Sequence, residues 1–130
     1  MSPAPLNDLK IVVVEDHDDA RRYLGVFLDG LGANVVVARN AFEGLDAIKN
    51  DAPNMVLSDI SMPGMDGFEL LREIRALGTE RAASVPVVAM SAFFTDADRT
   101  HLLDAGFKAY LPKPFSPERL VETILTVLNN

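Results

Sequence analysis

Acidic, hydroxyl and basic side chains each follow a short apolar stretch of the sequence. Glu15 and Asp16 come after the first stretch, Asp59 after the third, Ser91 after the fourth and Lys113 after the fifth. Taken singly, such residues are typical of helix caps, turns and solvated loops. Taken together, they would bring carboxylates, a hydroxyl and an ammonium to one site, which could bind a cation and transfer a phosphoryl group.

Three of these carboxylates meet if the first and third apolar stretches are neighbouring strands. Glu15, Asp16 and Asp59 would then repel one another strongly, so such a site needs a cation. A set of oxygen ligands favours a hard ion, and a site open enough to retain water favours Mg²⁺ over Ca²⁺. Lys113 adds a fixed positive charge. A cation and an ammonium around one carboxylate nucleophile are typical of phosphoryl transfer.

The elements that must position these residues alternate along the chain. Segments with helical spacing separate five nearly continuous apolar runs, which predict strands buried on both faces. Helix starts are predicted at Thr95 and Ser116, which have the pattern of N-caps. The apolar runs are residues 11–14, 35–38, 55–57, 87–90 and 109–111, and glycines expected to end helices are Gly32, Gly78 and Gly106.

Five strand and helix pairs predict an α/β fold with a parallel sheet and helices on both faces. Ligands of such sheets bind at the carboxyl ends of the strands, where the strand order reverses. With 130 residues, the chain is expected to form one domain over residues 10–130, after a short lead-in at 1–9.

Composition narrows the classes of function. The formal charge of −7 disfavours direct binding to nucleic acid. The sequence has no cysteine, which excludes disulfides and thiolate metal sites and favours the cytoplasm. No apolar run reaches the roughly 20 residues of a membrane span, and no secretory signal is evident. His17 and His101 are interpreted as surface or helix residues.

The motifs in this order resemble those of response-regulator receiver domains, the phosphorylated modules of two-component and phosphorelay signalling. They are the acidic pair Glu15-Asp16, the segment DISMPGMDG at 59–67, Ser91 followed by Ala92, and Lys113-Pro114-Phe115. The resemblance extends from about residue 10 to residue 128. It implies a flavodoxin-like, doubly wound three-layer sandwich with strand order 2-1-3-4-5.

The resemblance also implies a role for each site residue. Asp59 would accept the phosphoryl group from a phosphohistidine. Asp16, Asp59 and the backbone carbonyl of Ser61 would hold Mg²⁺, with Glu15 acting through a water molecule. Lys113 would pair with a phosphoryl oxygen, and its bond to Pro114 would be cis.

A switch is implied as well, in which Ser91 would hydrogen-bond the phosphate and the side chain of Tyr110 would follow it. The implied partners are a histidine kinase or histidine phosphotransfer protein, and a downstream protein on the face of the fourth helix, fifth strand and fifth helix. The chain would be a monomer or weak dimer, and a regulatory phosphoacceptor rather than an enzyme. Ser91 stands where threonine is commoner, and Phe93 and Phe94 are expected to pack inward or form an apolar patch for a partner.

Other interpretations remain open. The chain could be a receiver-like module that is not phosphorylated and serves interaction or dimerisation. A flavodoxin-like flavin or nucleotide site is disfavoured because the acidic loop at 15–18 would repel phosphate. A haloacid-dehalogenase-like phosphatase is disfavoured because Asp59-Ile60-Ser61 lacks the second acid of its D-x-D pattern. The chain could be a stand-alone regulator or part of a longer protein.

Overall fold

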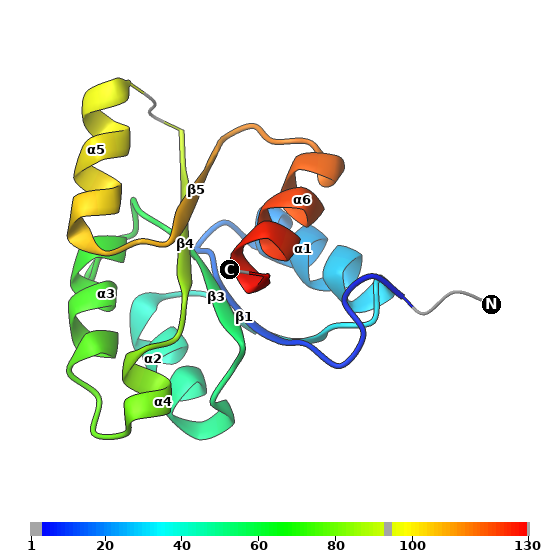
Figure 1. Cartoon of the computed structure of the whole chain (residues 1–130), viewed down its shortest axis with the longest axis horizontal. Helices are drawn as coiled ribbons and strands as arrows, with labels where there is room; N and C mark the ends of the chain where they lie inside the picture. Colours follow the sequence, from blue (N-terminus) through cyan, green and yellow to red (C-terminus); the bar gives the residue numbers. More distant parts are fainter. Residues whose placement is uncertain (1–3, 93–94, 130) are drawn as a thin grey trace.

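Five parallel strands form one sheet in the computed structural model, which describes residues 4–92 and 95–129. Their order is β2-β1-β3-β4-β5, which confirms the predicted order and the reversal beside β1 (Figure 1). The strands are β1 (Lys10–Val14), β2 (Asn34–Ala38), β3 (Met55–Asp59), β4 (Val87–Ser91) and β5 (Ala109–Pro112).

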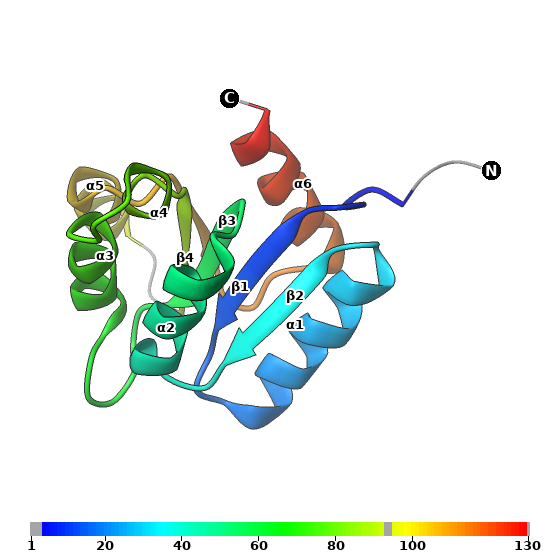
Figure 2. The same ribbon diagram turned by 90° about the horizontal axis from the view of Figure 1, so that it is seen from below.

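Helices cover both faces of the sheet, which confirms the three-layer α/β sandwich (Figure 2). One face packs against α1 (Asp18–Gly30) and α6 (Pro117–Leu128). The other packs against α2 (Ala41–Asp51), α3 (Gly67–Arg75), α4 (Glu80–Ala83) and α5 (Asp96–Ala105). The four-residue α4 was not predicted, because one turn is too short to show a helical period.

The central strands are buried on both faces, as their apolar runs predict. All five residues of β3 and of β4 are buried. The same prediction is wrong for β2, whose Val36 and Val37 are 37% and 45% exposed. The reason is that β2 lies at the edge of the sheet, where covering helices and neighbouring strands shield fewer of its side chains.

Most predicted helix ends are confirmed. Thr95 caps α5 with a reciprocal capping box, and the hydroxyl of Ser116 accepts a hydrogen bond from the backbone of α6. Gly106 ends α5 in the left-handed region at φ 113°. The prediction for Gly78 is wrong, because α3 ends earlier, at Arg75, with Ala76 as its C-cap.

The N-terminal segment contributes to the core on the α1 and α6 face. Leu6 is fully buried, and its backbone N–H donates to the carbonyl of Leu31 at 3.0 Å. Phe93 and Phe94, for which a packing or partner role was predicted, lie outside the described residues. Within the described part of the chain, no helix has the length and apolar character that crossing a bilayer requires.

Candidate functional site

The carboxyl ends of β1 and β3 bring the predicted acidic residues together. The two strands pair in register, with Val14 opposite Ser58, so Glu15 and Asp59 leave the sheet at the same level. The loop after β3 returns close to the strand tip. A Cβ on Gly67 would lie 2.7 Å from the carbonyl oxygen of Asp59, so only glycine fits there without a shift of backbone.

Glu15 is fully buried and is paired with Lys113 across the site. The ammonium nitrogen of Lys113 lies 2.7 Å from Oε1 of Glu15. The backbone N–H of His17 donates to the other oxygen, Oε2, at 3.2 Å. Burial alone would raise the pKa of Glu15, but the hydrogen bonds from Lys113 and His17 outweigh it and lower that pKa to about 2. Glu15 is therefore a fixed negative charge.

Asp59 is 5% exposed and occupies a different electrostatic environment. Its Oδ2 lies 3.4 Å from the ammonium of Lys113, farther than the Glu15 contact. Burial and then the charge of Glu15 raise the pKa of Asp59 to about 6, against the opposing attraction of Lys113. For Lys113, burial lowers the pKa, but the contacts with Glu15 and Asp59 outweigh it and raise that pKa. The ammonium of Lys113 therefore faces two carboxylates, those of Glu15 and Asp59, and Asp16 adds a third carboxylate to the site.

The carboxylates fit the predicted divalent cation. Oδ1 of Asp16 is buried and accepts no hydrogen bond from the described residues. Ligand atoms of Glu15, Asp16, His17 and Asp59 all lie within 4.8 Å of one another. A buried carboxylate oxygen without a donor, next to two further carboxylates, is a suitable ligand for a hard cation. Ser61 follows on the exposed loop after β3, where its carbonyl would be the remaining protein ligand.

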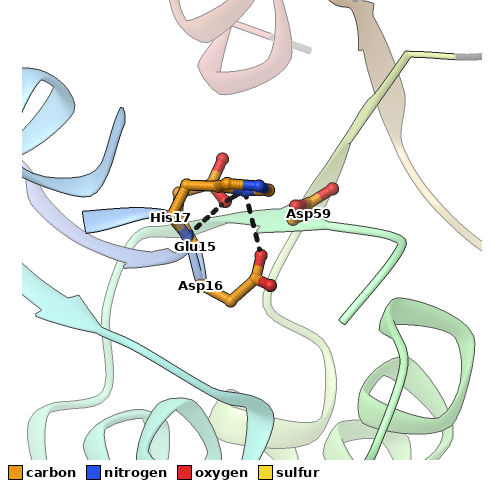
Figure 3. A group of neighbouring side chains, drawn as sticks. All are labelled: Glu15, Asp16, His17 and Asp59. Atoms are coloured by element: carbon orange, nitrogen blue, oxygen red, sulfur yellow. Dashed lines mark hydrogen bonds and ion pairs between the residues drawn. The ribbon is translucent and has the colours of Figure 1, made fainter. Parts of the chain in front are cut away.

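His17 is exposed, as the sequence predicts, and its ring also belongs to this cluster. Its Nδ1 lies 3.4 Å from both Oε2 of Glu15 and Oδ1 of Asp16 (Figure 3). Arg21, one turn into α1, also contacts the acidic loop, since its Nη1 donates to the carbonyl of Glu15 at 3.0 Å. In the sequence, the only indication of the His17 contacts is its position next to Glu15-Asp16. The indication for Arg21 is that it lies one helical turn after His17.

Ser91 in β4 and Tyr110 in β5 lie on the side of Asp59 that is opposite Glu15. Ser91 ends β4 and is 9% exposed, and its carbonyl accepts from the backbone of Lys113 at 2.7 Å. Tyr110 pairs with Ala89 one strand further along. The ring of Tyr110 lies under the guanidinium of Arg99, 5.8 Å from the ring centroid.

Two grooves adjoin these residues. One, of about 390 Å³, lies beside the site between α1 and the β5–α6 loop, and Tyr23, Lys113 and Phe115 line it. The other, of about 420 Å³, is formed by α5, β5 and α6, and Arg99 and Tyr110 line it. The Lys113-Pro114 bond beside the first groove is cis, as expected.

Comparisons with known proteins identify the family of the chain. The family model described as "Response regulator receiver domain" matches residues 11–125. The chain is 38% identical over 119 residues to an "Uncharacterized 14.6 kDa protein in sodA1 3'region" of Leptolyngbya boryana, covering 92% of this chain and 89% of that protein. It is 35% identical to the "Response regulator MprA" of Mycobacterium sp. (strain KMS) over 92% of this chain, but it spans only 50% of that relative.

One of the similar solved structures is a receiver domain of a sensor histidine kinase. The chain is similar, with a TM-score of 0.84 and 28% identity, to the receiver domain of the sensor histidine kinase PA1611 from Pseudomonas aeruginosa PAO1. The match covers 95% of this chain and 99% of that one. That structure is described as having a magnesium ion coordinated in the active site cleft.

Proposed function

The chain belongs to the response-regulator receiver domain family, and from this premise we propose that Asp59 accepts a phosphoryl group from a phosphohistidine donor. The observation that carries the proposal is the position of Lys113, which follows β5. Its ammonium contacts Glu15, which follows β1, and Asp59, which ends β3. A carboxylate nucleophile held beside a fixed cation is suited to phosphoryl transfer.

In the proposed reaction, a carboxylate oxygen of Asp59 attacks the phosphorus of the phosphohistidine in line. The new bond joins this oxygen to phosphorus, and the bond from phosphorus to the donor imidazole nitrogen breaks. The leaving imidazole keeps the electron pair and takes up a proton. The product is an aspartyl phosphate that carries a charge of about −1.5 to −2.

The other residues of the site favour this step electrostatically. With its pKa raised to about 6, Asp59 is still largely ionised at pH 7, as a nucleophile must be, and Lys113 attracts this ionised form and can pair with a transferred oxygen. Glu15 holds Lys113 in place through the 2.7 Å contact. Mg²⁺, held by Asp16, Asp59 and the carbonyl of Ser61, with Glu15 acting through water, would neutralise charge on the phosphoryl oxygens.

A conformational switch through Ser91 and Tyr110 is part of the proposal. A population shift from 1:99 to 99:1 needs about 5.5 kcal/mol of differential interaction. Hydrogen bonds from Ser91 and Lys113 to the phosphate, at about 1.5–3 kcal/mol each, are of that size. If Ser91 moves toward the phosphate, the half-buried Tyr110 can turn inward and change the α5–β5–α6 groove.

The proposed partners follow from the two grooves. A histidine kinase or histidine phosphotransfer protein would bring its phosphohistidine to Asp59 over the groove beside α1. A downstream protein would bind the face of α5, β5 and α6, which are the predicted fourth helix, fifth strand and fifth helix. We further propose that residues 10–130 act as one cytoplasmic receiver unit, as a monomer or weak dimer without direct contact to nucleic acid. Its only chemistry would be its own phosphorylation and dephosphorylation.

The test is phosphorylation by acetyl phosphate with Mg²⁺, followed by intact mass spectrometry. We expect the gain of one phosphoryl mass in the parent protein and none in Asp59→Asn. The matched control is Asp104→Asn, which lies exposed on α5 and should be phosphorylated like the parent. If the parent gains no mass while Mg²⁺ binds, the proposal fails and the unphosphorylated interaction module becomes the better interpretation.

A further inference from the structure

The edge strand β2 presents one row of backbone groups that no neighbouring strand pairs. The N–H of Asn34 donates to the carbonyl of Leu9 at 2.7 Å, so Asn34 directs its backbone groups toward β1. Because these groups alternate in direction along a strand, Val36 also faces β1, whereas Val35 and Val37 direct their N–H and C=O groups away from it. The described residues form no strand beyond β2, so these outward groups have no ladder partner.

This edge lacks the features that usually prevent strand pairing, which are a lysine, a proline or a bulge. The sequence of β2 is NVVVA, and all five of its residues pair with β1 in one uninterrupted register. The opposite edge strand, β5, ends on Pro112, which has no N–H to donate. In Figure 2, α1 and α2 lie on either side of β2 and neither crosses it. The β2 edge is therefore accessible to another strand.

We propose that two copies of this chain pair along β2, antiparallel and centred on Val36, so that one continuous sheet runs through both copies. In this register, Val35 of each copy lies opposite Val37 of the other, and the two residues exchange both N–H···O=C hydrogen bonds. Val36 lies opposite its own counterpart in the non-hydrogen-bonded position. The register is self-complementary, as the two-fold symmetry of a homodimer requires. This dimer goes beyond the proposed function and needs no phosphorylation.

Valine side chains would meet on both faces of the joined sheet. Val35 and Val37 lie on the α1 face, where they line a groove of about 340 Å³ together with Gly25 and Val26. Val36 points to the opposite face and lines a smaller groove of about 80 Å³. Cross-strand pairs of β-branched residues favour antiparallel pairing. The dimer would therefore cover apolar side chains that a single copy leaves exposed.

The outer face of α1 carries charges that suit the same two-fold arrangement. Arg22, Val26 and Asp29 have the spacing of one helical face and border the groove along β2. Val26 is 70% exposed, and neither Arg22 nor Asp29 forms an ion pair with another described residue. A two-fold axis beside Val26 would place Arg22 of each copy opposite Asp29 of the other. Because one face supplies both charges in complementary positions, a second copy fits this edge better than an unrelated strand.

Self-association of the full chain can be measured by sedimentation equilibrium up to millimolar concentration. Arg22→Asp and Asp29→Arg each place like charges across the two-fold axis, and each is expected to weaken self-association about tenfold. An equimolar mixture of the two variants restores both pairs of opposite charges and should form a mixed dimer with about the affinity of the parent. A dimer that tolerates each single variant unchanged would overturn the inference.

A matched pair of lysine substitutions separates β2 from the other exposed faces. Val37→Lys places a charge on the proposed interface and should leave the chain monomeric. Leu103→Lys changes a side chain of similar exposure, 41% against 45%, on α5, and should leave the dimer intact. Both positions are exposed, so both variants are expected to fold. Loss of the dimer in Leu103→Lys but not in Val37→Lys would place the interface on α5 and overturn the inference.

Amide hydrogen exchange tests the register residue by residue. The N–H groups of Val35 and Val37 should become protected as the concentration of the parent rises, whereas that of Val36 should be protected throughout. A parent that stays monomeric at millimolar concentration, or a dimer in which the two outward amides exchange freely, would overturn the inference. Protection that appears only with an added synthetic peptide of alternating valine and threonine would assign the edge to a strand of another protein and also overturn it. No arm involves Asp59, so each failure leaves the proposed function intact.

Discussion

Lys113 lies closer to Glu15 than to the proposed phosphoacceptor, with its Nζ 2.7 Å from Oε1 of Glu15 and 3.4 Å from Oδ2 of Asp59. Glu15 is fully buried, so its charge depends on this contact for compensation. The ammonium is anchored on one carboxylate while it faces the other. An ammonium positioned in this way could bind a phosphoryl oxygen on Asp59 while it keeps its contact with Glu15.

The first prediction concerns the energy of this pair. Lys113→Met should lower the free energy of unfolding by about 2–4 kcal/mol at pH 7 without Mg²⁺, because Glu15 stays buried without its cation. The double variant Glu15→Leu/Lys113→Met should recover most of this loss, since an apolar pair needs no compensation. Urea denaturation of the four members of the cycle measures the coupling. Additive losses in the double variant would show that the pair is energetically unimportant.

The second prediction concerns Asp59 and pH. Its pKa of about 6 in the folded state lies above the ordinary 3.8, so the folded state binds this proton more tightly than the unfolded chain does. The resulting stability is complete below about pH 4 and is lost as pH rises through 6. Without Mg²⁺, Asp59→Asn should therefore raise the free energy of unfolding by about 1–3 kcal/mol at pH 8 and by little at pH 4.

Denaturation of the parent and Asp59→Asn across this range measures the difference. Asp104→Asn, on the exposed part of α5, is the control and should follow the pH profile of the parent, because it keeps Asp59. An Asp59→Asn protein less stable than the parent at pH 8 would contradict the assigned direction of the pKa.

Much of this site could be predicted from the sequence, and the limits have physical causes. Parallel strands bring residues after successive apolar runs to one edge, so the meeting of Glu15, Asp59 and Lys113 follows from topology. The choice of Glu15 as the nearer partner of Lys113 depends on rotamers and burial, which no spacing encodes. The contacts of the exposed His17 ring with Glu15 and Asp16 depend on rotamers in the same way. The exposure of β2 was missed because edge and central strands here share the same valine-rich composition.

The third prediction tests the close approach of the loop after β3. Gly67→Ala would place a Cβ 2.7 Å from the carbonyl oxygen of Asp59 and 2.9 Å from Cα of Ile60, so backbone must move. A loss of about 1–3 kcal/mol in the free energy of unfolding and weaker Mg²⁺ binding are expected. Gly78→Ala is the control, because nothing lies within 4 Å of its Cβ position. Equal stability of the two variants would refute the packing argument.

The fourth prediction concerns the switch. The chain has two tyrosines, Tyr23 and Tyr110, so fluorotyrosine labelling yields two ¹⁹F signals, which Tyr23→Phe assigns. Addition of beryllofluoride with Mg²⁺, as a phosphate mimic, should shift the signal of Tyr110 in the parent protein. The shift should be strongly reduced in Ser91→Ala, whose hydroxyl is missing. A Tyr110 signal that is unmoved in the parent, or moves equally in Ser91→Ala, would exclude the proposed coupling.

The central claim is that Asp59 itself carries the phosphoryl group, and chemical mapping tests it most directly. After reaction with acetyl phosphate and Mg²⁺, borohydride reduces an aspartyl phosphate to homoserine, and peptide mass spectrometry locates the reduced residue. The account predicts homoserine at position 59, with Glu15 and Asp16 unmodified and no conversion in Asp59→Asn. Reduction at Asp16 or at any other carboxylate, with residue 59 recovered as aspartate, would contradict it.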